Sequence, residues 1–215
     1  ALAAGNTCVL KPAEQAPLSP LRLGELALEA GIPPGVINIV PGFGAEAGAS
    51  LASHPGIDHL AFTGSVETGT KIMQMAATHI TPVLLELGGK SPNIICRDAD
   101  IDRSVQTIVN SVAQNSGQNC AGGYRILVES SIQSEVVSKL KDRMSRLSLG
   151  PGLEDPDIGP LISEDQQNRV LDYMKIGKEE GAVIAMGGGL PKSPKLARGF
   201  FVEPTIFDHV DPRMR

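Results

Sequence analysis

The sequence predicts an α/β protein built on parallel strands. Short apolar runs such as TCVLK, VINIV and VLLEL alternate with longer stretches in which apolar residues recur at helical spacing. Glycine and proline, 24 and 16 residues, separate these stretches, and there is no tryptophan. The core must therefore consist mostly of Leu, Ile, Val and Ala. Strands that alternate with helices predict right-handed βαβ crossovers and a parallel sheet, which binds ligands at the carboxyl ends of its strands.

The elements of the first part of the chain follow in order. ALAAGN resembles a helix end with Gly5 or Asn6 in the left-handed cap, so we expect the chain to start within a domain. A helix with Leu18 near its start should stop at Gly31. The other elements expected here are strands at TCVLK, VINIV, HLAF and VLLEL, and helices opened by the glycine turns GFGAEAGASLASH and TGSVETGTKIMQMAA.

A second unit is expected from Gly88 onward, so that residues 1–87 and 88–215 form two parts. In the second part we predict strands at NIIC, RILVE, VIAM and FVEPTIF, and helices over 100–116, 133–147 and 163–180. The Gly/Pro-rich LGPGLEDPDIGP and GGGLPKSPKLARG are predicted to be loops.

The net charge and the cysteine content limit the partners and the cellular compartment that we expect for this protein. The net charge of -5 and the lack of a Lys/Arg block argue against nucleic acid or anionic lipid as a partner. No signal peptide or long apolar span is visible, so we expect a cytoplasmic protein without a membrane partner. The three cysteines form no metal or disulfide pattern, which fits a reducing compartment. Cys8 and Cys96 lie in apolar runs and are expected to be buried core residues.

Two glycine turns are candidate phosphate-binding loops. In IVPGFGAEAG the glycines follow GxGxxxG, which departs from the dinucleotide fingerprint GxGxxG. In FTGSVETG, Gly64 allows close backbone approach, and Ser65 can donate from a helix N-terminus that favours an anion. An ordinary turn followed by a helix N-cap would have the same sequence, so both readings remain open.

Three charged residues could also serve a site. Pro12 holds Lys11 extended past a strand end, where Lys11 and Glu14 could bind ribose hydroxyls or simply form a solvated pair. Glu86 interrupts the apolar strand VLLEL. In a cleft with little water its pKa would rise and it could act as a general base; alternatively it points to solvent or pairs with Lys90.

Cys120, in NSGQNCAGGYR, is a candidate nucleophile. Gly122 and Gly123 could let backbone N–H groups surround a developing oxyanion, although Cys120 could equally be an inert small residue in a turn. A thiol hydrolase would need a histidine partner, and none of the four histidines lies in a Cys-His signature: His54, His59, His79 and His209.

Taken in order, LKPAEQAPLSPL, GVINIVPGFGAEAG, FTGSVETG, LELGGKSPNII, NSGQNCAGGYR and GFFVEPTIF resemble the aldehyde dehydrogenase superfamily along essentially the whole chain. The resemblance implies that 1–87 belongs to a Rossmann-like cofactor-binding domain and 88–215 to the catalytic domain. It implies that Cys120 attacks an aldehyde to form a thiohemiacetal and then a thioester, and that Glu86 activates the water that releases a carboxylic acid. The Cys120 N–H would form half of the oxyanion hole.

The resemblance also implies a nicotinamide cofactor and assigns residues to it: Lys11 and Glu14 at the adenosine ribose, Gly44 near the adenine, Gly64, Ser65 and Gly69 at the pyrophosphate-facing helix, and Leu87 at the nicotinamide amide. Glu14 would bind the ribose hydroxyls and repel a 2'-phosphate, which favours NAD, with NADP possible. No metal is expected. The partners implied are a small-molecule aldehyde and, in the complete enzyme, further copies in a homo-oligomer.

Two family segments are not found in this chain: the one that completes the oxyanion hole and the one that holds the nicotinamide ribose. We therefore expect a central, incomplete portion of a longer enzyme, with little activity when isolated. The alternative is an inactive nucleotide-binding or assembly fragment, or a residual thiol esterase that uses Cys120 without cofactor.

Overall fold

The computed structural model describes all 215 residues, which divide into two compact units, 1–88 and 89–215. Each unit is α/β, as predicted. Three strand pairs are parallel, and one is antiparallel. No helix is both long and apolar enough to cross a bilayer.

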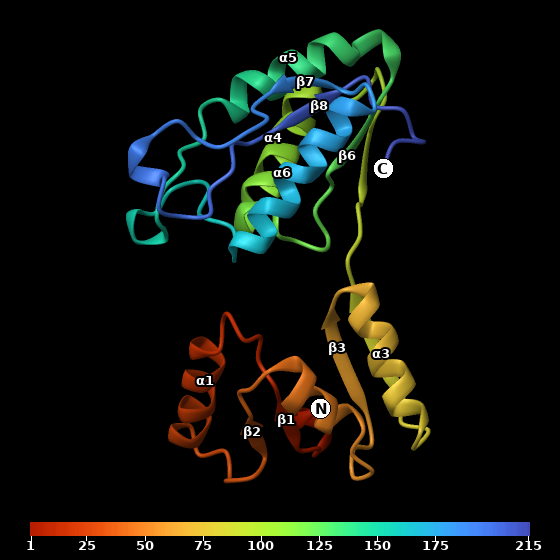
Figure 1. The fold of residues 1–215 in the computed structure, drawn as a ribbon, viewed down its shortest axis with the longest axis vertical. Helices are drawn as coiled ribbons and strands as arrows, with labels where there is room; N and C mark the ends of the chain where they lie inside the picture. Colours follow the sequence, from red (N-terminus) through yellow and green to blue (C-terminus); the bar gives the residue numbers. More distant parts are fainter. The chain divides into compact units, whose positions relative to one another are not determined.

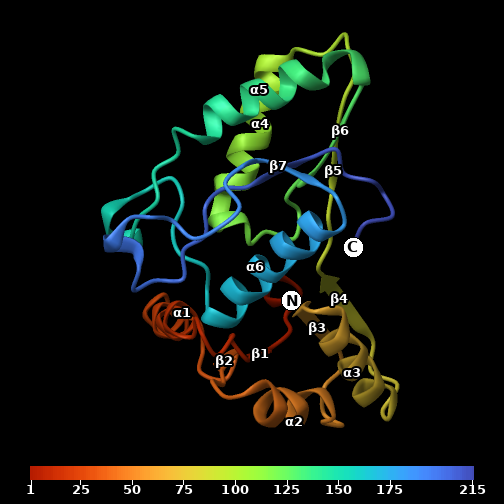
Figure 2. The same cartoon turned by 45° about the horizontal axis from the view of Figure 1, so that its top comes forward.

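The 1–88 unit consists of two parallel strand pairs and the helices that follow them (Figure 1). Its elements are η1 (Leu2–Ala4), β1 (Cys8–Leu10), α1 (Leu18–Glu29), β2 (Ile37–Ile39), η2 (Gly44–Gly48), α2 (Ala49–Ala52), β3 (Leu60–Gly64), α3 (Val66–Ala77) and β4 (Val83–Leu87). Gly5 adopts the left-handed conformation (φ 79°) expected for a helix cap. Helix α3 packs along β3 and β4, as Figure 2 shows. The crossover places the start of α3 at the carboxyl end of β3.

The 89–215 unit has its core where β5–β6, α4 and α5 meet. Its elements are β5 (Pro92–Ile95), α4 (Ile101–Ala113), η3 (Gln114–Gly117), β6 (Arg125–Val128), η4 (Ser130–Ile132), α5 (Gln133–Met144), η5 (Gly152–Glu154), α6 (Glu164–Glu179), β7 (Val183–Met186), η6 (Pro194–Leu196) and β8 (Ile206–Asp208). The buried cluster comprises Ile95, Val105, Ile108, Val109, Val136, Leu140, Met144 and Ile206. These residues come from four elements, so burial of the apolar faces of α4 and α5 holds the unit together.

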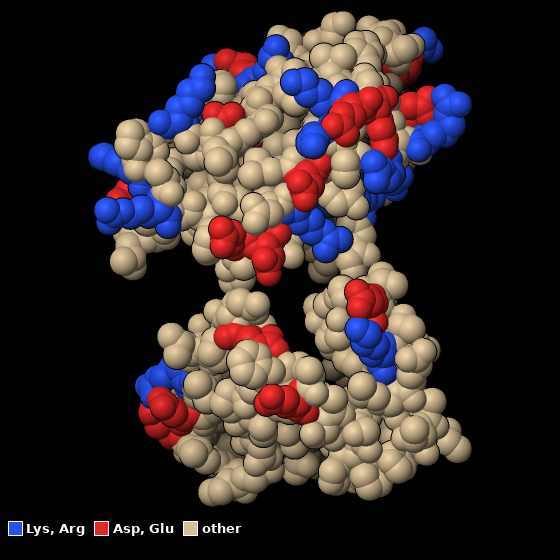
Figure 3. All heavy atoms as spheres, viewed as in Figure 1, with Lys and Arg blue, Asp and Glu red and all other residues tan.

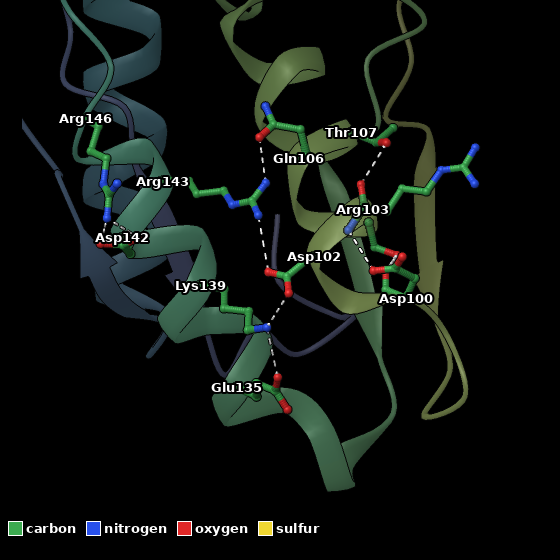
Figure 4. Close-up of polar contacts among 11 residues, drawn as sticks. Asp100, Asp102, Arg103, Gln106, Thr107, Glu135, Lys139, Asp142, Arg143 and Arg146 are labelled. Carbon is green, nitrogen blue, oxygen red and sulfur yellow. Dashed lines mark hydrogen bonds and ion pairs between the residues drawn. The ribbon is translucent and has the colours of Figure 1, made fainter.

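A polar network on the surface joins the two central helices of this unit (Figure 4). Asp102 on α4 accepts hydrogen bonds from Lys139 (3.0 Å) and Arg143 (3.2 Å) on α5, and Arg143 also donates to Gln106 (2.6 Å). Lys139 and Arg143 hold the pKa of Asp102 below its usual value. The network adds to the apolar contact that sets α5 against α4.

The structure corrects several expectations about the elements. Strands β7 and β8 are antiparallel, because the chain returns through the loop after β7 instead of through a crossover helix. The helix expected over 100–116 ends at Ala113, since Asn115 and Ser116 are left-handed. GFGAEAGASLASH forms a π-helical turn followed by a single α-helical turn. Cys96 is exposed and Cys8 half-buried; Cys96 follows the end of β5, on the side opposite the buried Ile95.

Candidate active site

Lys11, Glu14 and Gly44 form one cluster beyond the carboxyl ends of β1 and β2. The Glu14 carboxylate accepts the N–H of Gly44, and Lys11 Nζ lies 3.4 Å from Glu14 Oε1. Lys11 Nζ also donates to the carbonyl oxygens of Pro12 (2.6 Å) and Gly42 (2.9 Å). Backbone N–H groups, of Glu14 itself and then of Gly44, hold the Glu14 pKa below its usual value. The carboxylate is thus kept ionised beside the first glycine turn.

An apolar pocket of about 240 Å³ opens beside this cluster. It is lined by Val9, Lys11, Val40, Ala47, Ser50, Leu51 and His54. Its walls come from β1, from the end of β2 and from the helical turns η2 and α2. The walls are mostly apolar, and Lys11, the one ammonium group among them, also pairs with Glu14.

The second glycine turn lies at the carboxyl ends of β3 and β4. Gly64 pairs in register with Leu87, and a Cβ at Gly64 would collide with the Phe62 ring unless that ring moved. Ser65 is the N-cap of α3, and its hydroxyl accepts the N–H of Thr68 (3.2 Å). The structure is therefore compatible with both interpretations of this stretch, an ordinary helix N-cap and a phosphate-binding loop. Ser65 caps the helix, while the first N–H groups of α3 have no partner within the helix.

Gly69 and Leu87 are in contact behind this turn. A Cβ at Gly69 would lie only 2.9 Å from Leu87 Cδ2, so glycine allows α3 to approach the end of β4 closely. Glu86 precedes Leu87 and pairs in register with Thr63. Its side chain lies on the exposed face of the strand, so within this unit the structure agrees with the alternative in which Glu86 points to solvent. No hydrogen bond or ion pair joins the residues around the second glycine turn (Gly64, Ser65, Gly69, Glu86 and Leu87) to the cluster of Lys11, Glu14 and Gly44.

Cys120 lies at the second position of a turn that projects from the 89–215 unit. The Gly122 N–H donates to the Asn119 carbonyl (3.2 Å), and the Ala121 N–H donates to the Asn119 side chain (3.0 Å). Cys120 is exposed, and its own N–H has no hydrogen-bond partner. The turn therefore presents a thiol and a free N–H donor from the same residue.

The two glycines following Cys120 do not themselves offer a free N–H group. The Gly122 N–H is used within the turn, and the Gly123 N–H donates to Ser111 Oγ (3.3 Å), so neither is free for an oxyanion. Both glycines are buried, and a Cβ would meet the Tyr124 ring at Gly122 and the Asn93 amide at Gly123. Each of them makes room for a neighbouring side chain, and among the backbone N–H groups of residues 119–124 only that of Cys120 has no hydrogen-bond partner.

Three consecutive left-handed residues lead from α4 into this turn: Asn115 (φ 50°), Ser116 (φ 57°) and Gly117 (φ 74°). This conformation costs a non-glycine residue about 1 kcal/mol. Side-chain hydrogen bonds from Asn115 to the Gln118 carbonyl (2.9 Å) and from Ser116 to the Gly159 carbonyl (2.9 Å) offset that cost. The reversal after α4 is therefore held at both residues by contacts that a continuous helix would lack.

Tyr124 is a site residue that the sequence analysis missed. Its hydroxyl accepts the N–H of Asn119 (3.3 Å), and Lys90 Nζ lies 4.8 Å from its ring centroid. Lys90 therefore contacts an aromatic face, and no ion pair with Glu86 is found. One signal was available: the chain has only two tyrosines, and this one follows the cysteine by four positions. None of the four histidines hydrogen-bonds to Cys120, as a thiol hydrolase would require.

Comparison with known proteins identifies the family. Residues 1–215 match the aldehyde dehydrogenase family throughout. The chain belongs to this family. It is 45% identical over 216 residues to betaine aldehyde dehydrogenase of Bacillus subtilis, and 49% identical over 218 residues to retinal dehydrogenase 2 of Homo sapiens. All of the chain is covered, but only 44% and 41% of those relatives, so it spans less than half of their length.

Solved structures of aldehyde dehydrogenases have the same fold. The betaine aldehyde dehydrogenase of Staphylococcus aureus, solved in complex with NAD+, superposes with a TM-score of 0.95 at 43% identity. That match covers the whole chain and 43% of the Staphylococcus protein. An aldehyde dehydrogenase from Bacillus cereus gives a TM-score of 0.94 at 47% identity, covering 99% of the chain and 43% of that structure. The α/β aldehyde dehydrogenase fold predicted from the sequence is thereby confirmed.

Proposed function

We propose that this chain carries the nucleophile, the base and the main cofactor-binding residues of an NAD-dependent enzyme that oxidises an aldehyde to a carboxylic acid. The observation that supports this most is the Cys120 turn, which in a member of the aldehyde dehydrogenase family presents an exposed thiol beside a free backbone N–H. These are the two groups needed to attack a carbonyl and to stabilise the oxyanion that results.

Cys120 would act first. Its thiolate attacks the aldehyde carbon, a carbon–sulfur bond forms, and the carbonyl oxygen becomes an oxyanion that accepts the Cys120 N–H. A bound nicotinamide cofactor accepts the hydride of that carbon. The carbon then remains on Cys120 as a thioester, which must be hydrolysed before another aldehyde can react.

Glu86 would act second, as the general base. It takes a proton from water, the resulting hydroxide attacks the thioester carbon, and the carbon–sulfur bond breaks to release the acid and the thiolate. The exposure of Glu86 on β4 leaves its carboxylate accessible to water. A coenzyme A-acylating enzyme would have no need for this base, so Glu86 favours the hydrolytic reaction.

Seven residues of the 1–88 unit would hold the cofactor. Lys11 and Glu14 would bind the adenosine ribose, Gly44 would lie near the adenine, Gly64, Ser65 and Gly69 would provide the helix facing the pyrophosphate, and Leu87 would offer its backbone to the nicotinamide amide. The low pKa of Glu14 supports NAD as the cofactor, because an ionised carboxylate repels a 2'-phosphate. The apolar pocket beside Lys11 fits the adenosine end.

The proposed substrate class is an aldehyde without further restriction. The chain is about equally similar to relatives named for betaine aldehyde and for retinal, so similarity favours neither. In line with the sequence analysis, we propose a cytoplasmic homo-oligomer, whose function needs neither nucleic acid nor a membrane, with 1–87 in the cofactor-binding domain and 88–215 in the catalytic domain.

The test uses the complete enzyme that contains this chain, mixed with NAD and a panel of short and aromatic aldehydes, with NADH followed by absorbance. Wild type should turn over, Cys120→Ala should be inactive, and Glu86→Gln should release a burst of NADH and then stall at the thioester. Cys96→Ala is the matched control, because Cys96 is also a free, exposed cysteine, and it should behave as wild type. A Cys120→Ala enzyme that oxidises aldehyde as fast as wild type would refute the proposal.

A further inference from the structure

Tyr124 ties the two ends of the Cys120 turn together. From one end, the Asn119 N–H donates to the Tyr124 hydroxyl (3.3 Å); from the other, the Tyr124 N–H donates to the Gly122 carbonyl (3.0 Å). The ring lies where a side chain at Gly122 would otherwise be, so it fills the interior of the turn. Tyr124 therefore contacts both residues that flank the Cys120–Ala121 pair: Asn119 through its hydroxyl, and Gly122 through its backbone N–H and its ring.

Lys90 lies against the face of the Tyr124 ring. Its Nζ lies 4.8 Å from the Tyr124 ring centroid, a distance typical of a cation–π contact. The preceding residue, Gly89, passes beside the nucleophile itself: a Cβ there would lie 3.7 Å from the Cys120 carbonyl oxygen. The segment entering β5 therefore contacts both the Tyr124 ring, through Lys90, and the Cys120 turn, at Gly89.

We propose that Tyr124, with Lys90 against its ring, is a positioning residue for the nucleophile: it holds the turn so that the Cys120 thiol and the Cys120 N–H face the same carbonyl group. This inference rests on the proposed function and deepens it, because it names what orients the two reacting groups. Tyr124 acts through Asn119 and Gly122 and needs no contact with substrate.

The chemistry of the phenol agrees with this role. Burial raises the Tyr124 pKa, the hydrogen bond from the Asn119 N–H lowers it, and the nearby Cys120 raises it; the net shift is upward, so the hydroxyl stays neutral near pH 7. A neutral hydroxyl can accept the Asn119 N–H without bringing a second negative charge next to the thiolate. A phenylalanine would keep the ring and lose only the acceptor.

The first experiment is independent of activity and compares hydrogen exchange in wild type and Tyr124→Phe, in the complete enzyme. Loss of the acceptor should speed amide exchange in a peptide covering residues 115–123 by about tenfold, which corresponds to about 1.4 kcal/mol of local opening. Tyr173→Phe is the matched control, because Tyr173 is the other tyrosine and is half-exposed on α6. Unchanged exchange at 115–123 in Tyr124→Phe would overturn the inference, whatever the enzyme's activity.

The second experiment separates positioning from thiol reactivity. Single-turnover NADH formation should fall about tenfold in Tyr124→Phe with the KM for NAD unchanged, while iodoacetamide should alkylate Cys120 at nearly the wild-type rate. Alkylation needs an accessible thiol but no oriented N–H, and Cys96 in the same molecule serves as the internal reference. An equal loss of both rates would show that Tyr124 activates the thiol, and no loss of either would reduce it to packing; both results overturn the proposal.

Lys90→Met provides a second variant if Tyr124→Phe fails to fold. Removing the cation should lower the single-turnover rate about threefold and leave Cys120 alkylation unchanged. If wild type makes no NADH with any aldehyde, the proposed function fails while hydrogen exchange still tests the positioning contact. A Lys90→Met enzyme with the wild-type single-turnover rate would exclude Lys90 from the role.

Discussion

Alanine at Gly122 would place a methyl group inside the space that the Tyr124 ring occupies. The added Cβ would meet the hydroxyl and two ring carbons of Tyr124, so the ring or the backbone of the turn must shift. Overpacking of this kind costs about 1–3 kcal/mol, and expelling the ring would also leave the Asn119 N–H without its partner, for about 1 kcal/mol more. We therefore expect Gly122→Ala to lower the free energy of unfolding by about 2–4 kcal/mol.

A double-mutant cycle assigns this cost to one contact. If the ring is the obstacle, Gly122→Ala should cost less than about 0.5 kcal/mol in a Tyr124→Ala background, giving a coupling energy of about 2 kcal/mol. Gly152→Ala is the control, because a Cβ there meets nothing within 4 Å, and it should change the free energy by less than about 0.5 kcal/mol.

The assay is urea unfolding followed by circular dichroism at fixed protein concentration, with midpoints and slopes fitted for all four members of the cycle and the control. The single variant should also lose single-turnover activity with aldehyde. A coupling energy near zero would refute the reasoning, since it would mean that the ring of Tyr124 does not fill the turn below Gly122.

Three further predictions follow from the structure. Leu140→Ala, at a side chain only 2% exposed, should lower the free energy of unfolding in urea by about 2–5 kcal/mol. Leu190→Ala, at a side chain 53% exposed, should lower it by less than about 1 kcal/mol. Equal losses would contradict the placement of the core. The pKa of Glu14 in the folded state lies below its ordinary value of 4.5, so the stability that this carboxylate contributes is present above that pH and is lost as the pH falls through the folded-state pKa. The difference in free energy of unfolding between wild type and Glu14→Gln should therefore shrink below about pH 4.5. A difference that grows there would contradict this sign. Lys139→Met should lower the unfolding midpoint slightly at low salt, and the difference should vanish at about 1 M salt because the Asp102 network is exposed; a loss that persists at high salt would show a packing role for Lys139.

Periodicity predicted a helix or strand correctly where the sequence pattern of that one segment is enough to specify it. The apolar runs at Val83–Leu87 and Val183–Met186 are strands, and the stretch at Leu18–Glu29 is a helix, because each pattern matches one repeat and is bounded by glycine or proline. The direction of a strand carries no such signal. The antiparallel pairing of Val183–Met186 with Ile206–Asp208 depends on how a long loop returns, which the repeat does not encode.

The candidate site shows the same division. A single carboxylate in an apolar strand was enough to select Glu86, but its exposure depends on which face of the strand is covered. The sequence singled out the glycines after Cys120, but their N–H groups are used by Asn119 and Ser111, and the space beside them is taken by the side chains of Tyr124 and Asn93.

By itself, the sequence determined the α/β class, the order of the elements, the aldehyde dehydrogenase family and the identity of the candidate residues, because period, turn chemistry and motif spacing are local properties. Only the tertiary structure decided which hydrogen-bond donors stay free. The Cys120 N–H is available and its neighbours are not, because Asn119, Ser111 and Tyr124 meet around one turn, and the distances among their atoms follow from packing rather than from residue order.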